Sequence, residues 1–300
     1  MKRRKFSGVF LALTATLLWS ANYVIARGLS DSIPPVTLAV LRWTVAFLVL
    51  LPIAGKDIPK QFPSIKKHFK FFLLASILGV SLFNTLIYTA GHYTSATNLS
   101  LIAITAPVFI IIMSILFLKT KFSYKTLPGI IVTLIGLLTL ISKGNPIALL
   151  ELDFNKGDLL MLLAAICFSG YSVLMTQKPR EVSMPVLLLV TSFSGLVLLL
   201  PFLSLPVNKL PSPIFTQEVL LSVLYVGIFA SIIAFYSWNH AILRIGSQRA
   251  GILYYTLPLF SSLLAIMFLG EQVQTFHLIS FAFIIAGIYI SRNKKQYNNV

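Results

Sequence analysis

A small set of polar and aromatic residues lies inside otherwise apolar stretches of this 300-residue chain. Polar groups inside hydrocarbon are costly, so those that persist usually face a cavity or another helix. Asn84 and Tyr88 are four residues apart, as are Tyr236 and His240, so each pair shares a helix face. Aromatic walls with a few amide and hydroxyl groups suit an amphipathic organic solute. The residues predicted to line such a cavity are Trp19, Asn22, Asn84, Tyr88, Ser169, Tyr171, Tyr236, Asn239 and Tyr254.

Two plainer roles also fit part of this set. Asn22, Asn84 and Asn239 could serve only to hydrogen-bond neighbouring helices. Trp and Tyr residues near span ends are usually anchors at the membrane interface, and we expect that role for Trp238 and Tyr289.

Two prolines occupy matching places near the middle of two apolar stretches, Pro107 and Pro258. Each removes a backbone hydrogen bond and bends its helix, which frees a carbonyl four residues earlier, at Ala103 and Tyr254. Prolines at corresponding points of two halves point to a transporter's midplane site. They could equally be packing kinks copied by duplication.

The distribution of charge narrows the chemistry. All eight acidic residues fall in connecting segments or at span ends, and Arg42 is the one basic residue within a span. A proton antiporter for cationic drugs needs a buried acid, and a sugar-phosphate carrier needs several buried cations. Neutral or zwitterionic solutes remain, with amino acids first.

The sequence holds no grouping typical of an enzyme. No two histidines have metal-ligand spacing, and no nucleophile has a plausible base nearby. We therefore expect no metal and no cofactor, and an integral membrane enzyme is the least favoured reading.

The elements that would position these residues are membrane-spanning helices. Hydrophobic residues make up 57% of the chain and the mean hydropathy is +0.89, more apolar surface than a soluble core of this length buries. Stretches long enough to cross about 30 Å of hydrocarbon begin near Phe6, Pro34, Phe69, Ala96, Tyr124, Asp158, Pro185, Glu218, Ser247 and Gln274. The prediction is an all-α membrane protein with ten spans.

The ten spans form two repeats, residues 1–145 and 146–300. Gly8, Ser20 and Pro52 recur 149 residues later as Gly157, Ser169 and Pro201. Pro107 and Gly136 recur 151 residues later as Pro258 and Gly287. Since each repeat holds five spans, the repeats must face opposite ways, and such inverted repeats around a central cavity are typical of secondary transporters.

Basic residues set the predicted orientation. If the N-terminus is cytoplasmic, the inner segments hold 19 of the 24 Lys and Arg residues and the outer segments hold four. This asymmetry places both termini in the cytoplasm of a bacterial cell, with the chain in the inner membrane. The net charge of +16 then reflects topology and lipid headgroup contact rather than nucleic-acid binding. We expect a monomer or weak homodimer whose partners are the lipid bilayer and a small-molecule substrate.

Four short motifs carry a resemblance to a known family: Leu18-Trp19-Ser20-Ala21-Asn22, Pro34 with Arg42, Thr94-Ser95-Ala96 and Leu269-Gly270-Glu271. With the ten spans and the duplication, the chain resembles the drug/metabolite transporter superfamily, and within it EamA-type transporters with two tandem EamA domains. The resemblance implies a cavity surrounded by spans 1, 3, 4, 6, 8 and 9, with spans 5 and 10 bracing the outside. It also implies metabolite transport, most often export. One departure is that the first repeat has Lys119-Thr120 where the second has Gly270-Glu271.

Efflux of amino acids or related metabolites by alternating access is the predicted function. A flippase for a lipid-linked substrate, or an accessory membrane subunit of the same fold, is the alternative.

Arg42 lies 8 residues past Pro34, about 12 Å into its span, where a lone cation needs a partner. We predict that Arg42 and Glu271 pair to help close the outer gate, against the simpler reading that Arg42 snorkels to headgroups. Each single charge reversal, Arg42→Glu or Glu271→Arg, should reduce transport, and the double reversal should restore it. Absence of rescue in a flux assay would remove the pairing.

Overall fold

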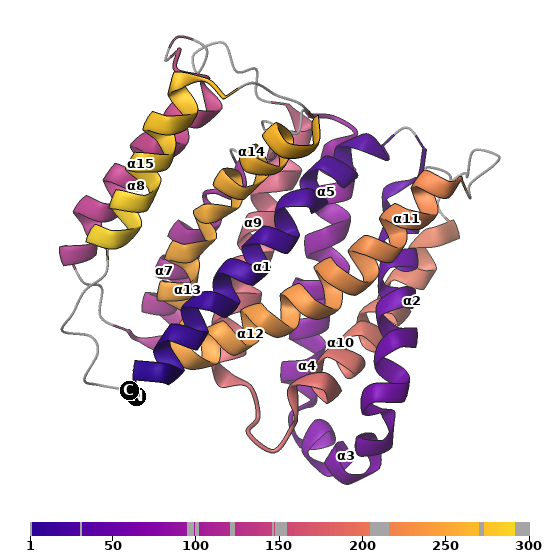
Figure 1. Cartoon of the computed structure of the whole chain (residues 1–300). Coiled ribbons are helices and arrows are strands. Elements are labelled where there is room, and N and C mark those ends of the chain that lie inside the picture. The colour runs from indigo at the N-terminus through magenta and orange to yellow at the C-terminus, as the bar shows by residue number, and fades with distance from the viewer. Residues whose placement is uncertain are drawn as a thin grey trace.

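The computed structural model describes residues 2–30, 32–94, 99, 102–120, 124–145, 147, 155–204, 216–269 and 273–291. Within these residues the chain is helical and forms no strand, and its helices make ten rods (Figure 1). Five rods are long and apolar enough to cross a membrane, and shorter apolar helices accompany them. The predicted all-α membrane fold is confirmed.

The first half contributes five of these rods. They are α1 (Lys2–Gly28); α2 (Pro35–Ala54), which continues through η1 (Gly55–Asp57) into α3 (Ile58–Lys67); α4 (Phe69–Ser76), the π-helix η2 (Ile77–Leu82) and α5 (Phe83–Gly91); α7 (Ala106–Leu118); and η3 (Tyr124–Thr126) with α8 (Leu127–Ile141).

The second half repeats this order. Its rods are α9 (Lys156–Leu174) with η5 (Met175–Gln177); α10 (Met184–Leu199) with η6 (Leu200–Ser204); α11 (Gln217–Tyr225), the π-helix η8 (Val226–Ile233) and α12 (Ala234–Ile245); α13 (Ser247–Tyr254) with α14 (Thr256–Leu269); and α15 (Thr275–Ile290).

Helices of one half pack against the other half in pairs, and each pair has a counterpart when the two halves are exchanged. Helix α1 packs against α12 and α14, and its counterpart α9 packs against α5 and α7. Helix α2 packs against η8, and its counterpart α10 packs against η2. The pairs α2 with α10 and α8 with α15 map onto themselves. Exchanging the halves therefore maps each of these helix pairs onto another pair that is also in contact.

The starts of α1 and α9 show that the two halves are inverted. Near the start of α1, Arg244 at the end of α12 donates a hydrogen bond to Ser7 over 2.8 Å. At the start of α9, Thr94 just after α5 donates to Asp158 over 2.7 Å. Since α5 and α12 end at opposite ends of the bundle (Figure 1), α1 and α9 begin at opposite ends.

Two glycines allow these close approaches. A Cβ atom on Gly8 would lie 2.7 Å from the Ile245 side chain, and one on Gly157 would lie 2.8 Å from the carbonyl oxygen of Ala90. The repeat of Gly8 as Gly157 thus marks the same helix crossing in both halves.

Helices α8 and α15 stand side by side at the edge of the bundle (Figure 1) and, with Ile104, Tyr255 and Leu259, form a second, smaller core. Gly136 and Gly287 let their backbones approach: a Cβ on Gly136 would lie 2.9 Å from the backbone nitrogen of Ile284. The larger core extends through the other rods. The site must therefore be sought there, away from the α8–α15 pair.

A π-helix interrupts the third rod of each half, at residues 77–82 and 226–233. In each wide turn a side chain bonds a carbonyl five residues earlier. Asn84 donates to Gly79 over 3.2 Å, and Ser231 donates to Val226 over 2.8 Å. Short π-helices inside α-helices are frequent at functional sites, and these two occupy matching places in the repeats.

Candidate functional site

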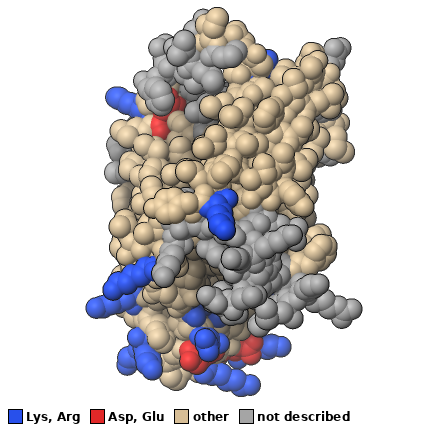
Figure 2. All heavy atoms as spheres, turned by 90° about the vertical axis from the view of Figure 1, so that its left-hand side faces the viewer, with Lys and Arg blue, Asp and Glu red and all other residues tan. Residues whose placement is uncertain are grey.

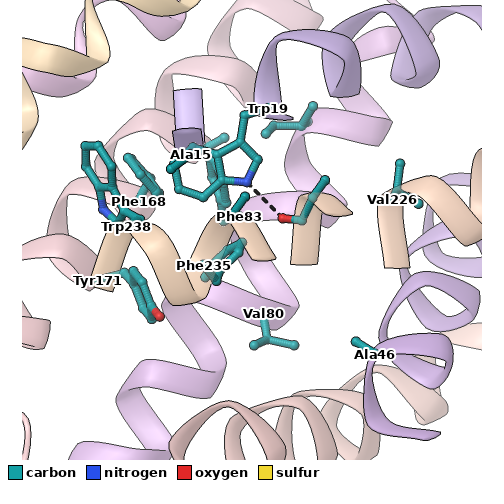
Figure 3. Packing of buried hydrophobic residues seen from close by; sticks show 14 of the residues in the cluster. Ala15, Trp19, Ala46, Val80, Phe83, Phe168, Tyr171, Val226, Phe235 and Trp238 are labelled. Atoms are coloured by element: carbon teal, nitrogen blue, oxygen red, sulfur yellow. Dashed lines mark hydrogen bonds between the residues drawn. The ribbon is translucent and has the colours of Figure 1, made fainter. Parts of the chain in front are cut away.

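An aromatic cluster lies where the two halves meet. Trp19 and Phe168 occupy equivalent positions, 149 residues apart, and their rings contact each other edge to face at a centroid distance of 5.3 Å. Trp19 thus contacts its own counterpart in the other repeat, so this contact lies on the pseudo-two-fold axis that relates the two halves. Figure 3 shows the cluster around Trp19, whose indole nitrogen donates to the carbonyl of Ala230 over 2.9 Å.

Helix α12 supplies two further rings of the aromatic cluster. Phe235 and Trp238 lie 5.3 and 5.5 Å from Trp19 between ring centroids. Tyr254, at the end of α13, lies 5.2 Å from Phe168. Hence we define the aromatic cluster as Trp19, Phe168, Phe235, Trp238 and Tyr254, each of them at most 4% exposed.

A buried polar network surrounds Arg42, whose side chain is 0% exposed. Its Nη1 donates to Asn22 over 3.0 Å and to the Tyr88 hydroxyl over 2.7 Å. Its Nε donates to Ser231 and its Nη2 to the carbonyl of Ala230. The Arg42 network therefore joins three rods of the first half to the π-helix of the second.

A second polar pair occupies the equivalent place in the other repeat. In the first half, Tyr88 donates to Asn22 over 3.2 Å. In the second half, Asn239 donates to Tyr171 over 2.7 Å. Tyr171 follows Asn22 by 149 residues and Asn239 follows Tyr88 by 151, so the amide and the phenol have exchanged positions. Since the halves are inverted, these two polar pairs lie on opposite sides of the aromatic cluster.

Two amide oxygens near this centre are buried without a hydrogen-bond donor. They belong to Asn84 and Asn239, both 0% exposed, and neither oxygen has a partner among the described residues. A buried polar atom left unpaired is costly and calls for an explanation, such as a ligand or an ordered water.

The residues around this centre offer no metal site: the described part of the chain holds no group of three His, Cys, Asp or Glu residues that could bind an ion. The chemistry available is stacking, hydrogen bonding and a single fixed cation.

Comparison with known proteins identifies the family. The model of the EamA-like transporter family matches residues 6–142 and again residues 155–292. The chain belongs to this family. One match falls in each predicted repeat, as expected for two tandem EamA domains.

Sequence alignments with related transporters cover nearly the whole chain. The uncharacterized transporter YetK of Bacillus subtilis is 27% identical and the alignment covers 98% of this chain and 89% of YetK. Uncharacterized transporters of Clostridium kluyveri and Archaeoglobus fulgidus are 28% and 26% identical, over 96% of this chain and 94% and 98% of their own lengths. A protein of known crystal structure is 21% identical in sequence and superposes on this chain with a TM-score of 0.76. The match covers 96% of this chain and 97% of the other protein, which supports the fold.

The structure brings eight of the nine predicted cavity residues into or beside this buried centre, and Tyr236 is the exception. Tyr236 is 39% exposed and packs on His240, with ring centroids 4.4 Å apart. The inward face of α12 carries Phe235 and Trp238 instead, and Tyr236 is turned away from it by about 100°, one helical step.

Trp238 corrects a second expectation. It is not an interfacial anchor: its side chain is 0% exposed and donates to the Ser172 hydroxyl over 3.0 Å. Nearness to a span end did not reveal which face of α12 packs against α1. Tyr289, by contrast, is 71% exposed, as an anchor requires.

The remaining predicted residues have structural contacts of their own. Ser169 donates to the carbonyls of Ala165 and Ala106, and Tyr254 shares a hydrogen bond of 3.0 Å with Tyr23. Where a central cavity is predicted, aromatic rings fill the space between the halves.

The two prolines lie in the first turns of α7 and α14 rather than inside continuous helices. Both spans are interrupted just before them, by turns at residues 104–105 and at Tyr255. The predicted bends are thus complete breaks.

Arg42 does not snorkel, because it is fully buried, and its contacts among the described residues are with neutral groups. Its predicted partner Glu271 lies outside the described residues, so the gate pairing stays a prediction.

The pair formed by Tyr171 and Asn239 yields a stability prediction. Tyr171→Phe removes the acceptor of the buried Asn239 amide, which should lower the free energy of unfolding in detergent by about 1–3 kcal/mol. Tyr236→Phe alters an exposed ring by the same single atom and should change it by less than about 0.5 kcal/mol. Equal effects of the two substitutions would show that the buried pair contributes nothing to stability.

Proposed function

We propose that this transporter moves small neutral or zwitterionic metabolites, amino acids first, by alternating access. The observation that carries the proposal is the placement of two equivalent polar pairs on opposite sides of one aromatic cluster, at the contact between inverted halves. A solute held among these rings would meet one amide–phenol pair toward each face of the membrane. Inverted repeats commonly work by rocking around such a central site.

Contacts across the halves at both ends of the bundle support this mechanism. At the end where α1 begins, Arg244 bonds Ser7 and Gln248 bonds Thr120, each over 2.8 Å. At the other end, Thr94 bonds Asp158. Opening either end requires breaking one set of bonds while the other set stays closed, which is how alternating access avoids an open channel.

Transport is tested with purified protein in proteoliposomes. Labelled amino acids should accumulate without any added enzyme. Trp19→Ala removes the central ring and should reduce flux about tenfold, since an aromatic contact contributes about 0.5–1.5 kcal/mol beyond its buried area and about 1.4 kcal/mol is a factor of ten. An imposed pH gradient should leave the flux unchanged. Absence of flux for every amino acid tested, with movement of a lipid-linked substrate instead, would favour a flippase and overturn the proposal.

We also propose that both termini are cytoplasmic. The end of the bundle at which α1 begins carries most of the Lys and Arg residues seen on the face in Figure 2, below a broad region with few charged residues. This distribution matches the positive-inside rule.

Cysteine labelling tests the orientation, because Cys167 is the only native cysteine. In a Cys167→Ala background, a cysteine at Lys2 or Val300 should react with a membrane-impermeant maleimide only after the cells are permeabilised. Ser204→Cys, an exposed position in the predicted outer segment between spans 7 and 8, serves as the control and should react in intact cells. Labelling of Lys2→Cys in intact cells would reverse the assignment.

A further inference from the structure

The strongest unexplained feature of the site is a fully buried cation with neutral partners. Arg42 is 0% exposed, and no described carboxylate pairs with it. Its guanidinium carbon lies 5.3 Å from the centre of the Trp43 ring, which adds a cation–π contact. Neutral groups satisfy hydrogen bonds but leave the positive charge uncompensated, and burying an uncompensated charge is expensive.

The second repeat shows that the fold itself does not need this charge. The position equivalent to Arg42, 149 residues later, is Thr191. Thr191 is 2% exposed, and its hydroxyl donates to the carbonyls of Leu187 and Leu188 in its own helix. The same helix crossing therefore holds a cation in the first repeat. In the second repeat it holds a hydroxyl that bonds only the backbone of its own helix. A role in folding alone does not account for the difference.

The hydrogen bonds of Arg42 leave one of its terminal N–H groups available to an anion. A guanidinium has five N–H groups. One on Nε, both on Nη1 and one on Nη2 have acceptors, so one N–H of Nη2 has none among the described residues. The Tyr88 hydroxyl accepts from Nη1 and donates to Asn22. By rotating its O–H it can release Nη1 and donate to an incoming carboxylate, which then receives bonds from Nη1, Nη2 and Tyr88.

We propose that Arg42 is the carboxylate anchor of the substrate site and makes a free carboxylate a requirement for transport. This assignment rests on the proposed function and restricts it to α-amino acids and related monocarboxylates. Arg42 sets the preference for acids over their neutralised derivatives because a bidentate guanidinium–carboxylate pair is charge-assisted.

The wild-type protein tests the assignment without any mutation. In proteoliposomes loaded for uptake of a labelled amino acid, the unlabelled acid should compete about 10- to 100-fold better than its carboxamide or methyl ester. The same preference should appear as thermal stabilisation of the detergent-purified protein by the acid and not by the amide, a measurement that does not depend on flux. Equal competition by acid and amide, or equal stabilisation, would overturn the assignment while leaving transport itself established.

Variants then locate the preference on Arg42. Arg42→Thr copies the residue of the other repeat and is the replacement best matched to the fold. It should abolish the discrimination between acid and amide, with the melting temperature recorded as a check of folding. Arg42→Lys keeps the charge but not the bidentate geometry and should retain a reduced preference.

A matched control should keep the full preference. Thr191→Ala changes the equivalent position of the other repeat, which bonds only its own helix, and leaves the Arg42 network intact. An Arg42→Thr protein that still prefers the acid would place carboxylate recognition elsewhere. No flux with any solute in wild type would instead count against the proposed function, and stabilisation by the acid alone would still support the anchor.

Discussion

A polar group inside a bilayer must be satisfied by the protein itself, because hydrocarbon offers no water to hydrogen-bond it. Much of the interior of this transporter follows from that constraint. The guanidinium of Arg42 is met by an amide, a phenol, a hydroxyl and a backbone carbonyl drawn from three other rods. The carbonyls displaced by the two π-helices are met by Asn84 and Ser231. A few buried atoms, such as the Asn84 and Asn239 oxygens, have no hydrogen-bond partner among the described residues. These atoms are therefore candidates for bonding a ligand.

The two halves share their helix arrangement but differ in the side chains at the centre. Small residues at helix crossings, such as Gly8 and Gly157, are the same in both halves because the backbones approach equally closely in both. The side chains at the centre differ. Trp19 faces Phe168, the amide and phenol of the polar pairs have exchanged places, and Arg42 has become Thr191. A symmetric frame with asymmetric polar groups can bind a solute whose two ends differ in charge, which a fully symmetric site could not orient.

Sequence patterns predicted this structure where the signal was long or periodic. The spans, the duplication and the family follow from apolar length, spacing and motifs, and the shared burial of Asn84 and Tyr88 follows from helical spacing. Two features escaped. The π-helices leave no compositional trace, because a single extra residue per turn is invisible in a uniformly apolar stretch. The inward face of α12 depends on that change of register, so Trp238 and Tyr236 were assigned to the wrong sides. Arg42 was recognised as costly, but its partners come from rods up to 189 residues away, a distance that no local pattern encodes.

The strength of the contacts at each level of the bundle suits a protein that must change shape. The bonds joining the halves at the two ends are few and involve single hydroxyl, amide, carboxylate and guanidinium groups. Such a bond contributes about 0.5–1.5 kcal/mol between neutral groups and about 1.5–3 kcal/mol where one group is charged. Exchanging one set for the other therefore changes the free energy by only a few kcal/mol, within the range over which a ligand shifts populations. The centre is different, because its rings are packed against one another and exclude water. Empty, it favours the closed arrangement described above. A solute that replaces ring contacts with its own and gives Arg42 the charge it lacks would lower the cost of separating the halves at either end. The ends and the centre are thus coupled through Arg42, which bonds residues of both halves.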